Sequence, residues 1–402
     1  MSALPSSFTG LGIAPNLLQR IEHLRFVTPT AIQHKAIPVA LEGHDIVGVA
    51  QTGTGKTLSF AVPILQRLAQ NPGKALVLVP TRELALQVEE DFRKLNQNHE
   101  LRSVVLIGGV SFGQQLRTLY RKPRVLIATP GRLLDHLKQK SVSLSDVHIL
   151  VLDEADRMLD MGFAPDIARI IHFVPKSRQT MLFSATMPAD IVKLATAYMR
   201  LPFQIEVAPP GTAAEKVTQE LFIVKKESKN IILKQLLAKY HGSILLFSRT
   251  KHGARHIAHA VRTMGHRSAE IHSDRSLDQR REALEGFKSG KYRILVATDI
   301  ASRGIDVKGI ELVINYDLPD DAENYVHRIG RTGRAGQEGH AISLATPDQR
   351  KDVRNIEAII KTVIPISKHP DMPLEEFSKP QVVFNSSRFS RGRRRPIFRR
   401  RR

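Results

Sequence analysis

The chain of 402 residues contains no cysteine and no long apolar run. Without cysteine there can be no disulfide, no thiolate metal site and no cysteine nucleophile, and such a composition is typical of a reducing compartment. No stretch approaches the roughly 20 apolar residues of a membrane-spanning helix, and the N-terminal residues lack the basic start and apolar run of a secretion signal. We therefore expect a cytoplasmic protein without a membrane partner.

Acidic residues are in the minority, because 39 Asp and Glu stand against 60 Lys and Arg and give a formal net charge of +21. Residues 388–402 contain nine arginines and no acid, and such a self-repelling tail is expected to be disordered. More than half of the charge excess lies elsewhere in the chain. A basic surface of this kind favours a polyanionic partner. Nucleic acid is favoured over anionic lipid, because no amphipathic or acylation signal accompanies the charge.

Short runs rich in β-branched residues alternate with helical patterns, which predicts an α/β fold with mostly parallel sheets flanked by helices. The runs lie at residues 45–50, 75–80, 104–109, 124–130, 148–156 and 180–186, and then at 243–250, 268–273, 293–299, 312–317 and 341–347. The alternation of strand-like and helical segments stops near residues 207–216. The chain is also longer than a protein with one hydrophobic core usually is. The predicted parts are a first domain at 1–207, a linker at 208–216, a second domain at 217–366, and an extension with the basic tail at 367–402.

The segment AQTGTGKT, at residues 50–57, follows the first strand-like run. Glycines in such a loop let backbone N–H groups approach phosphate oxygens at a helix N-terminus, a lysine supplies positive charge, and a following hydroxyl can ligate Mg²⁺. Ala50 stands where the usual pattern has its first glycine, and a structural loop without a ligand is the alternative. The residues predicted to bind nucleotide phosphates with Mg²⁺ are Thr52, Gly53, Thr54, Gly55, Lys56 and Thr57.

Two adjacent carboxylates, Asp153 and Glu154, follow the run HILVL. At a strand end such a pair can hold Mg²⁺ through water and orient an attacking water, while the alternative is an ordinary acidic helix cap. The phosphate loop upstream favours the first interpretation. We predict that Asp153 and the Thr57 hydroxyl form the metal site, and that Lys56, Asp153 and Glu154 are catalytic.

The stretch HRIGRTGRAG, at residues 327–336, concentrates positive charge far from the phosphate loop. Phosphoryl transfer needs cations near the charge that develops on the transferred group, and another domain can supply them. Arg331 and Arg334 are three residues apart, so on a helix they would share one face. We predict that they act across the two domains, which would make hydrolysis depend on domain closure. A solvent-facing arginine-rich helix is the alternative.

Together these segments resemble the DEAD-box RNA helicases, a family of ATP-dependent enzymes with two RecA-like domains, over residues 8–347. The motif that names the family stands here at residues 153–156. The resemblance implies ATP and Mg²⁺ as cofactors, structured or duplex RNA as the partner, and local separation of short duplexes by ATP-driven closure of the domains. Residues 156–167 and the arginine-rich C-terminus further resemble the bacterial RhlE-like branch, which would add ribosomal or RNA-decay proteins as candidate partners.

The resemblance also implies residues that the patterns above do not reach. The segment FVTPTAIQ is similar to the family's Q motif, in which Phe26 would stack on adenine and Gln33 would read its edge. The other residues implied at the nucleotide are the upstream aromatic Phe8, with Gly304 and Asp306, and His327 joins the catalytic group. The residues implied to couple the nucleotide site to RNA are Asp156, Ser184 and Thr186.

An RNA-binding track follows from the same resemblance. Its members are Arg82, Gly109, Thr129 and Arg132 in the first domain, and Arg249, Arg280 and Thr298 in the second. Such residues suit the phosphates and sugars of RNA better than base edges, so we expect recognition that is largely independent of sequence. Leu277 stands where the family commonly has glutamine, three residues before Arg280, and the contact of that amide is in question.

Three functions are consistent with these residues. The first is an RNA-dependent ATPase that separates short duplexes, the second is a DNA translocase of the same superfamily, and the third is an ATP-gated RNA clamp or scaffold. The adenine-reading motif and the DEAD tetrad disfavour the DNA translocase. The RNA clamp is kept as an alternative function, because a clamp can also hydrolyse ATP.

Overall fold

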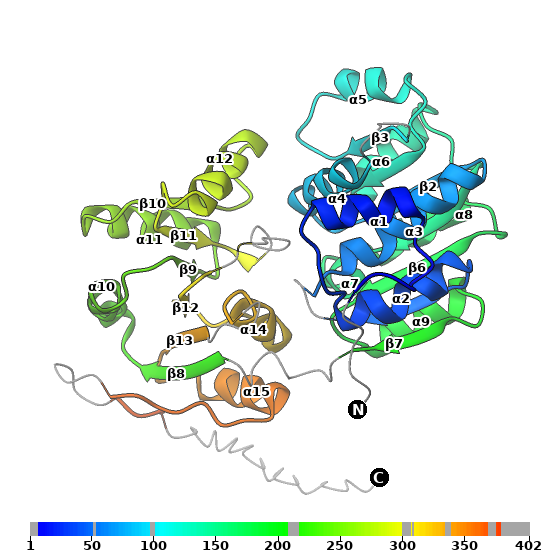
Figure 1. Cartoon of the computed structure of the whole chain (residues 1–402). Helices are drawn as coiled ribbons and strands as arrows, with labels where there is room; N and C mark the ends of the chain where they lie inside the picture. Colours follow the sequence, from blue (N-terminus) through cyan, green and yellow to red (C-terminus); the bar gives the residue numbers. More distant parts are fainter. Residues whose placement is uncertain are drawn as a thin grey trace, which may run out of the picture.

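A computed structural model of the chain describes residues 7–50, 54–96, 101–207, 217–299, 307, 309–333, 339–368 and 375–378. These residues form two α/β units, each built on one sheet with helices packed against it (Figure 1). The predicted linker at 208–216 and the basic tail lie outside the described residues. Within the described part, no helix has both the length and the apolar character needed to cross a membrane.

The first unit carries a seven-stranded sheet in the order β3-β4-β2-β5-β6-β1-β7. Its elements are α1 (Pro15–His23), α2 (Ala31–Leu41), β1 (Ile46–Val49), α3 (Lys56–Gln70), β2 (Lys74–Leu78), α4 (Arg82–Leu95), β3 (Ser103–Leu106), α5 (Phe112–Leu119), β4 (Val125–Ala128), α6 (Pro130–Lys138), β5 (Val147–Leu152), α7 (Ala155–Asp160), α8 (Ala164–His172), β6 (Gln179–Ser184), α9 (Ala189–Tyr198) and β7 (Phe203–Glu206). All of its strand pairs are parallel.

The second unit carries a six-stranded sheet in the order β10-β11-β9-β12-β13-β8, again with parallel pairs. Its elements are β8 (Val217–Ile223), a 3₁₀ turn (Lys226–Ser228), α10 (Lys229–Lys239), β9 (Ile244–Phe247), α11 (Lys251–Thr263), β10 (Ser268–Ile271), α12 (Leu277–Lys288), β11 (Ile294–Ala297), β12 (Leu312–Asn315), α14 (Ala322–Ile329), β13 (Gly339–Ala345) and α15 (Arg350–Ile360). The predicted α/β class with two parallel-sheet units is therefore confirmed.

Each strand-like run of the sequence is a strand of one of these sheets, while β7 and β8 had not been predicted. Both are edge strands. Three of the four residues of β7 are exposed, so the strand lacks the apolar run that marks its neighbours. Strand β1, which pairs with β7, is by contrast buried along its whole length.

The helices bury one apolar face against the sheets. In α4, residues Leu84, Val88, Phe92 and Leu95 recur at helical spacing and are all buried. Thr81 begins this helix by accepting a hydrogen bond from the backbone N–H of Leu84 at 3.2 Å. The helix therefore starts directly after β2 and places its first residues at the end of the sheet.

The carboxyl ends of the parallel strands meet at one edge of each sheet, which is where α/β proteins usually bind ligands. In the first unit, the segments that follow β1, β2, β4, β5 and β6 are those that carry the phosphate loop, Arg82, Thr129, the paired carboxylates and Thr186. The topology thus brings residues from five separate segments to one edge.

Candidate nucleotide site and RNA-facing residues

The phosphate loop is held by the glutamine of the Q motif. Gly55 ends the loop with a left-handed backbone (φ 89°), and α3 begins at Lys56. The Gln33 amide nitrogen donates to the Gly55 carbonyl at 3.1 Å, and its oxygen accepts from the Thr30 backbone N–H at 2.9 Å. A Cβ atom at Gly55 would collide with this amide. Gln33 keeps one N–H and one lone pair, which is the pair of groups that an adenine edge requires.

Lys56 is an unpartnered buried cation. Its residue is 6% exposed, and Nζ has no hydrogen-bond partner in the described structure. Burying an ammonium group without a partner is costly. A phosphate oxygen would supply the missing partner, so the environment of Lys56 fits its predicted role.

The two predicted catalytic carboxylates follow β5 and are both buried, Asp153 at 3% exposure and Glu154 at 4%. Burial raises the pKa of Asp153 to about 6, although the nearby Lys56 charge partly offsets this effect. The Asp153 carboxylate accepts from the Glu154 backbone N–H at 3.0 Å. Glu154 itself has a left-handed backbone (φ 51°), a conformation that costs a non-glycine residue about 1 kcal/mol or more. Such strain at the end of a buried strand is typical of functional residues.

These residues fit a magnesium site of the sparse kind. Mg²⁺ usually keeps several waters and is held by one or two carboxylates together with substrate phosphates. Among the described residues, no group of three or more His, Asp or Glu could hold a metal alone. Asp153 and the Thr57 hydroxyl, with a nucleotide phosphate, are the groups that would bind Mg²⁺.

The three residues predicted to couple nucleotide and RNA lie together. One oxygen of the Asp156 carboxylate accepts from the backbone N–H groups of Ala185 and Thr186, at 2.9 and 3.1 Å, and from the Thr186 hydroxyl at 3.2 Å. Ser184 is the last residue of β6 and is fully buried. A movement of α7 would therefore be transmitted directly to the segment that follows β6.

Arg331 does not lie on a helix, so the helical arrangement in which it would share a face with Arg334 is not found at this residue. The helix α14 ends at Ile329, because Gly330 follows as its cap, and Arg331 lies in the next turn. Arg331 is 3% exposed, and His327 lies in the last turn of α14. The other predicted residues Thr52, Gly53, Gly304, Asp306 and Arg334 lie outside the described residues.

Arg328, which the sequence analysis did not select, is a structural arginine. Its guanidinium forms two bonds with the Asp299 carboxylate, at 2.5 and 2.7 Å, and a third with the Asn315 side chain at 3.1 Å. It also lies over the Phe247 ring at 4.9 Å. One cation of residues 327–336, Arg328, therefore stabilises the packing of α14 against the sheet. The signal available in the sequence was Asp299, an acid two residues after the end of β11.

In the first domain, the Arg82 side chain lies against the glycine pair of the predicted RNA track. A Cβ atom at Gly108 would be 3.2 Å from its guanidinium, and one at Gly109 would collide with it. Gly109 also has a left-handed backbone (φ 81°). Thr129 lies at the start of α6, where its backbone N–H bonds to Leu106. Arg82 begins the helix after β2, the two glycines follow β3, and Thr129 follows β4, so all four lie at the same edge of the sheet.

Arg132 is oriented by α5. Its guanidinium lies over the Phe112 ring at 5.3 Å and donates to the Val110 carbonyl at 2.5 Å. The His136 ring stacks on the same Phe112 ring, with 4.2 Å between the ring centroids. Burial, together with the Arg132 charge, lowers the pKa of His136. Phe112 and His136 are positioning residues that the sequence analysis missed.

In the second domain, the predicted RNA residues differ in their surroundings. Arg249 is exposed and pairs with Asp320 at 3.2 Å, while Thr298 is 9% exposed at the end of β11. Arg280 forms a 2.8 Å ion pair with Glu83 of the first domain, and both side chains are under 10% exposed. Arg280 therefore contacts the other domain in this structure.

Two further contacts join the domains. The Arg157 guanidinium of α7 donates to the Asn324 side chain of α14 at 3.1 Å. Leu277, at the start of α12, packs against the hydrophobic core of the first domain. The position at which the family commonly has a glutamine is here an apolar contact between the two domains.

The two aromatic residues predicted at the adenine differ. Phe26 is 45% exposed and can offer its ring to a ligand. Phe8 is 3% exposed and packs in the core of the first domain, where its ring is covered by protein. We therefore assign Phe8 a packing role in place of the predicted nucleotide contact.

A phosphate loop, paired carboxylates and a second parallel-sheet domain in contact with the first define a two-domain nucleotide-driven enzyme. Residues 30–194 match the family model of the DEAD/DEAH box helicases, and residues 228–336 match the helicase conserved C-terminal domain. The chain belongs to the DEAD/DEAH box helicase family and is an ATP-dependent RNA helicase.

Relatives with a similar sequence are yeast proteins called ATP-dependent rRNA helicase RRP3. The one from Candida albicans is 45% identical over 368 residues, which cover 90% of this chain and 69% of the relative. The one from Saccharomyces cerevisiae (strain ATCC 204508 / S288c) is 43% identical over 364 residues, covering 89% and 73%. These relatives give no support to the expected RhlE-like branch. That expectation depended on one short segment, the compact length and the tail composition, and none of these features separates branches of a family.

Solved structures of the same family are similar over most of the chain. Mss116 bound to ssRNA and UDP-BeF has a TM-score of 0.85 at 28% identity, covering 93% of this chain and 81% of that chain. Dbp5 of S. cerevisiae bound to RNA and ADP BeF3 has a TM-score of 0.80 at 30% identity, covering 91% and 96%. A DEAD box protein from Methanococcus jannaschii is 39% identical and covers 91% and 100%, yet its TM-score is 0.55.

Proposed function

We propose that the protein is an RNA-stimulated ATPase that separates short RNA duplexes locally by closing its two domains around ATP and RNA. The observation that carries this proposal is the double role of α7. Directly after Glu154, this helix holds the Thr186 segment through Asp156 and contacts α14 of the second domain through Arg157. Because α14 leads into Arg331, closure at this contact would bring the arginine to the nucleotide site.

Each group then has a distinct task. Lys56 binds the phosphates, Glu154 orients the attacking water, and Arg331 stabilises the charge that develops on the transferred phosphoryl group. Mg²⁺, when bound near Asp153, supplies further positive charge against the phosphate oxygens. Hydrolysis would be slow in the open state, because Arg331 belongs to the other domain.

The relative placement of the domains supports a closed working state. The TM-score is 0.85 with Mss116 bound to ssRNA and UDP-BeF, and 0.55 with the M. jannaschii protein, at nearly equal coverage of this chain. The buried Arg280–Glu83 ion pair supports the same arrangement. Since the relatives are named rRNA helicases, we propose structured RNA, ribosomal RNA included, as the substrate, with ribosomal proteins as candidate partners.

The test compares ATP hydrolysis with RNA, with DNA of the same sequence and without nucleic acid, and follows the displacement of a labelled strand from a short RNA duplex. We expect stimulation by RNA and displacement that requires ATP. Glu154→Gln is the control, because it should bind both ligands without turnover. Equal stimulation by DNA would favour a translocase. Long dwell on RNA without displacement would favour a clamp.

A further inference from the structure

The loop between α5 and β4 carries a group of cations that the predicted RNA track does not include. We define the edge patch as Arg102, Arg117, Tyr120, Arg121 and Lys122. Arg117 lies on α5, the next three residues follow that helix, and Arg102 precedes β3. Figure 1 shows α5 at the outer end of the first domain, beside β3 and α6.

The edge patch has no acidic partner within the part of the chain that the structure describes. Among the described residues, none of its four cations forms an ion pair, whereas the nearby Lys74 and Lys94 pair with Asp146 at 3.0 Å and Glu90 at 2.8 Å. Among the described residues, the Arg102 guanidinium donates to a neutral group, the backbone carbonyl of Arg121, at 3.3 Å. Four unpaired cations repel one another, so a purely structural role gives no reason for their grouping.

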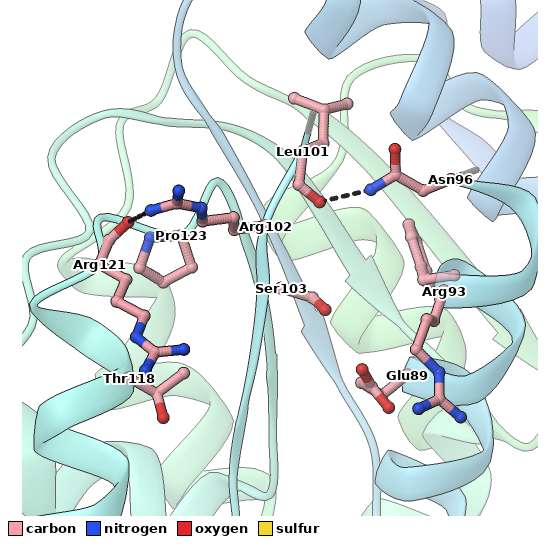
Figure 2. Close-up of a pocket in the computed structure, with 10 residues that line it drawn as sticks. Glu89, Arg93, Asn96, Leu101, Arg102, Ser103, Thr118, Arg121 and Pro123 are labelled. Carbon is pink, nitrogen blue, oxygen red and sulfur yellow. Dashed lines mark hydrogen bonds between the residues drawn. The ribbon is translucent and has the colours of Figure 1, made fainter. Parts of the chain in front are cut away.

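The surface around the edge patch is hollowed on two sides. Figure 2 shows Arg102 and Arg121 on one side of a hollow of about 420 Å³ and Arg93 on the other, with Glu89 as the acid of its lining. A second hollow of about 520 Å³ lies beside Lys122. Tyr120 is 74% exposed between these cations. An exposed aromatic ring among cations is typical of surfaces that bind unpaired nucleotides.

The helix α5 joins the edge patch to the predicted RNA track. It begins just after Gly109 and is eight residues long, so it spans about 12 Å at about 1.5 Å per residue. The exposed residues Gln114, Arg117 and Arg121 are three and four positions apart and follow one face of this segment. A strand that leaves Gly109 along this face would therefore pass Gln114 and then reach Arg117 and Arg121.

We propose that the edge patch is a second RNA-binding surface of the first domain, which binds the phosphates of RNA flanking the helicase site and stacks an unpaired base on Tyr120. The proposal rests on the proposed function, since it presumes that RNA occupies the Gly109 surface. RNA is preferred to an acidic protein as the partner because the cations continue the RNA track and include an exposed ring.

The test uses the full chain and single-stranded RNAs of increasing length. The patch variant carries Arg117→Gln, Arg121→Gln and Lys122→Gln. The control variant removes the same charge from the second domain with Lys234→Gln, Lys239→Gln and Lys361→Gln. For long RNA, the slope of log affinity against log salt should become shallower by about two units in the patch variant alone, because each phosphate contact contributes about 0.7 for single strands.

Further measurements separate this proposal from its alternatives. Turnover at saturating RNA should be unchanged in the patch variant, while the concentration of long RNA for half-maximal stimulation should rise. Tyr120→Ala should weaken long-RNA binding several-fold, and Tyr120→Phe should retain it. Equal salt slopes in both triple variants would overturn the proposal and point to a protein partner. A wild-type protein whose ATPase ignores RNA would instead overturn the proposed function.

Discussion

Asp153→Asn should make the nucleotide-free protein more stable relative to wild type at pH 8 than at pH 5. Burial raises the pKa of this carboxyl from 3.8 to about 6 in the folded protein, against the attraction of Lys56. A pKa raised by folding means that the protonated acid stabilises the fold. That stability is fully present below pH 3.8 and is lost as the pH rises through about 6.

The size of the effect follows from the two pKa values. The whole shift of about 2 units corresponds to roughly 3 kcal/mol, at about 1.4 kcal/mol per unit. Between pH 5 and pH 8, linkage gives a loss of about 1.4 kcal/mol for a folded pKa near 6. Asparagine does not titrate, so the variant should gain this amount relative to wild type over the same range. For a domain of this size, the gain corresponds to about 3 to 6 °C in the midpoint of unfolding.

The assay is thermal unfolding of the first domain at pH 5 and pH 8 without nucleotide or Mg²⁺. Asp135→Asn, on the exposed face of α6, is the control for removal of one negative charge. Other titrating groups are common to both proteins, so they cancel from the difference between variant and wild type. A difference that is the same at both pH values would refute the assignment of Asp153 as a buried acid whose charge awaits a cation.

Lys56→Ala should abolish ATP binding, because only the lysine is placed to pair with phosphates. Glu154→Gln should bind ATP and lose turnover. Near wild-type turnover in the Gln variant would contradict the role of Glu154. Gln33→Ala should lose a preference for ATP over GTP, measured as the ratio of the two kcat/KM values, and equal use of GTP by the unmodified protein would exclude adenine reading. Leu277→Gln should make the closed state less populated in the presence of ATP and RNA, because an apolar contact worth about 1–2 kcal/mol is lost. The measurement is energy transfer between dyes on the two domains, which should decrease. Unchanged transfer would show that this leucine does not stabilise closure.

The strands and the main motifs could be predicted because their signals are local. A buried parallel strand needs a continuous apolar run, and the residues that follow it reach the same edge of the sheet. The group of Asp156, Ser184 and Thr186 follows from this rule together with the family resemblance. The edge strand β7 was not predicted, because three of its four residues are exposed and no apolar run marks it.

Other features could not be read from spacing. The spacing of Arg331 and Arg334 would give them a shared face only on a helix, but α14 ends at Ile329, before Arg331. The structural role of Arg328 depends on Asp299 and Asn315, which come from two other segments of the second sheet. Contacts of this kind depend on how distant segments pack, and a local pattern of arginines carries no information about their partners.

The ion pair between Arg280 and Glu83 shows how RNA and domain placement can be linked. Burial raises the pKa of Glu83, and the charge of Arg280 only partly offsets this increase, so the carboxylate depends on its partner. Removing one member of a buried pair leaves an uncompensated charge and typically costs about 3–5 kcal/mol. If an RNA phosphate competes for Arg280, the Glu83 carboxylate must either take up a proton or regain contact with water. Contact with water requires the two domains to separate at α12. Leu277 opposes that separation, because its apolar contact lies one helical turn from the ion pair. The residue that departs from the family pattern therefore lies where RNA binding and domain closure would be balanced against each other.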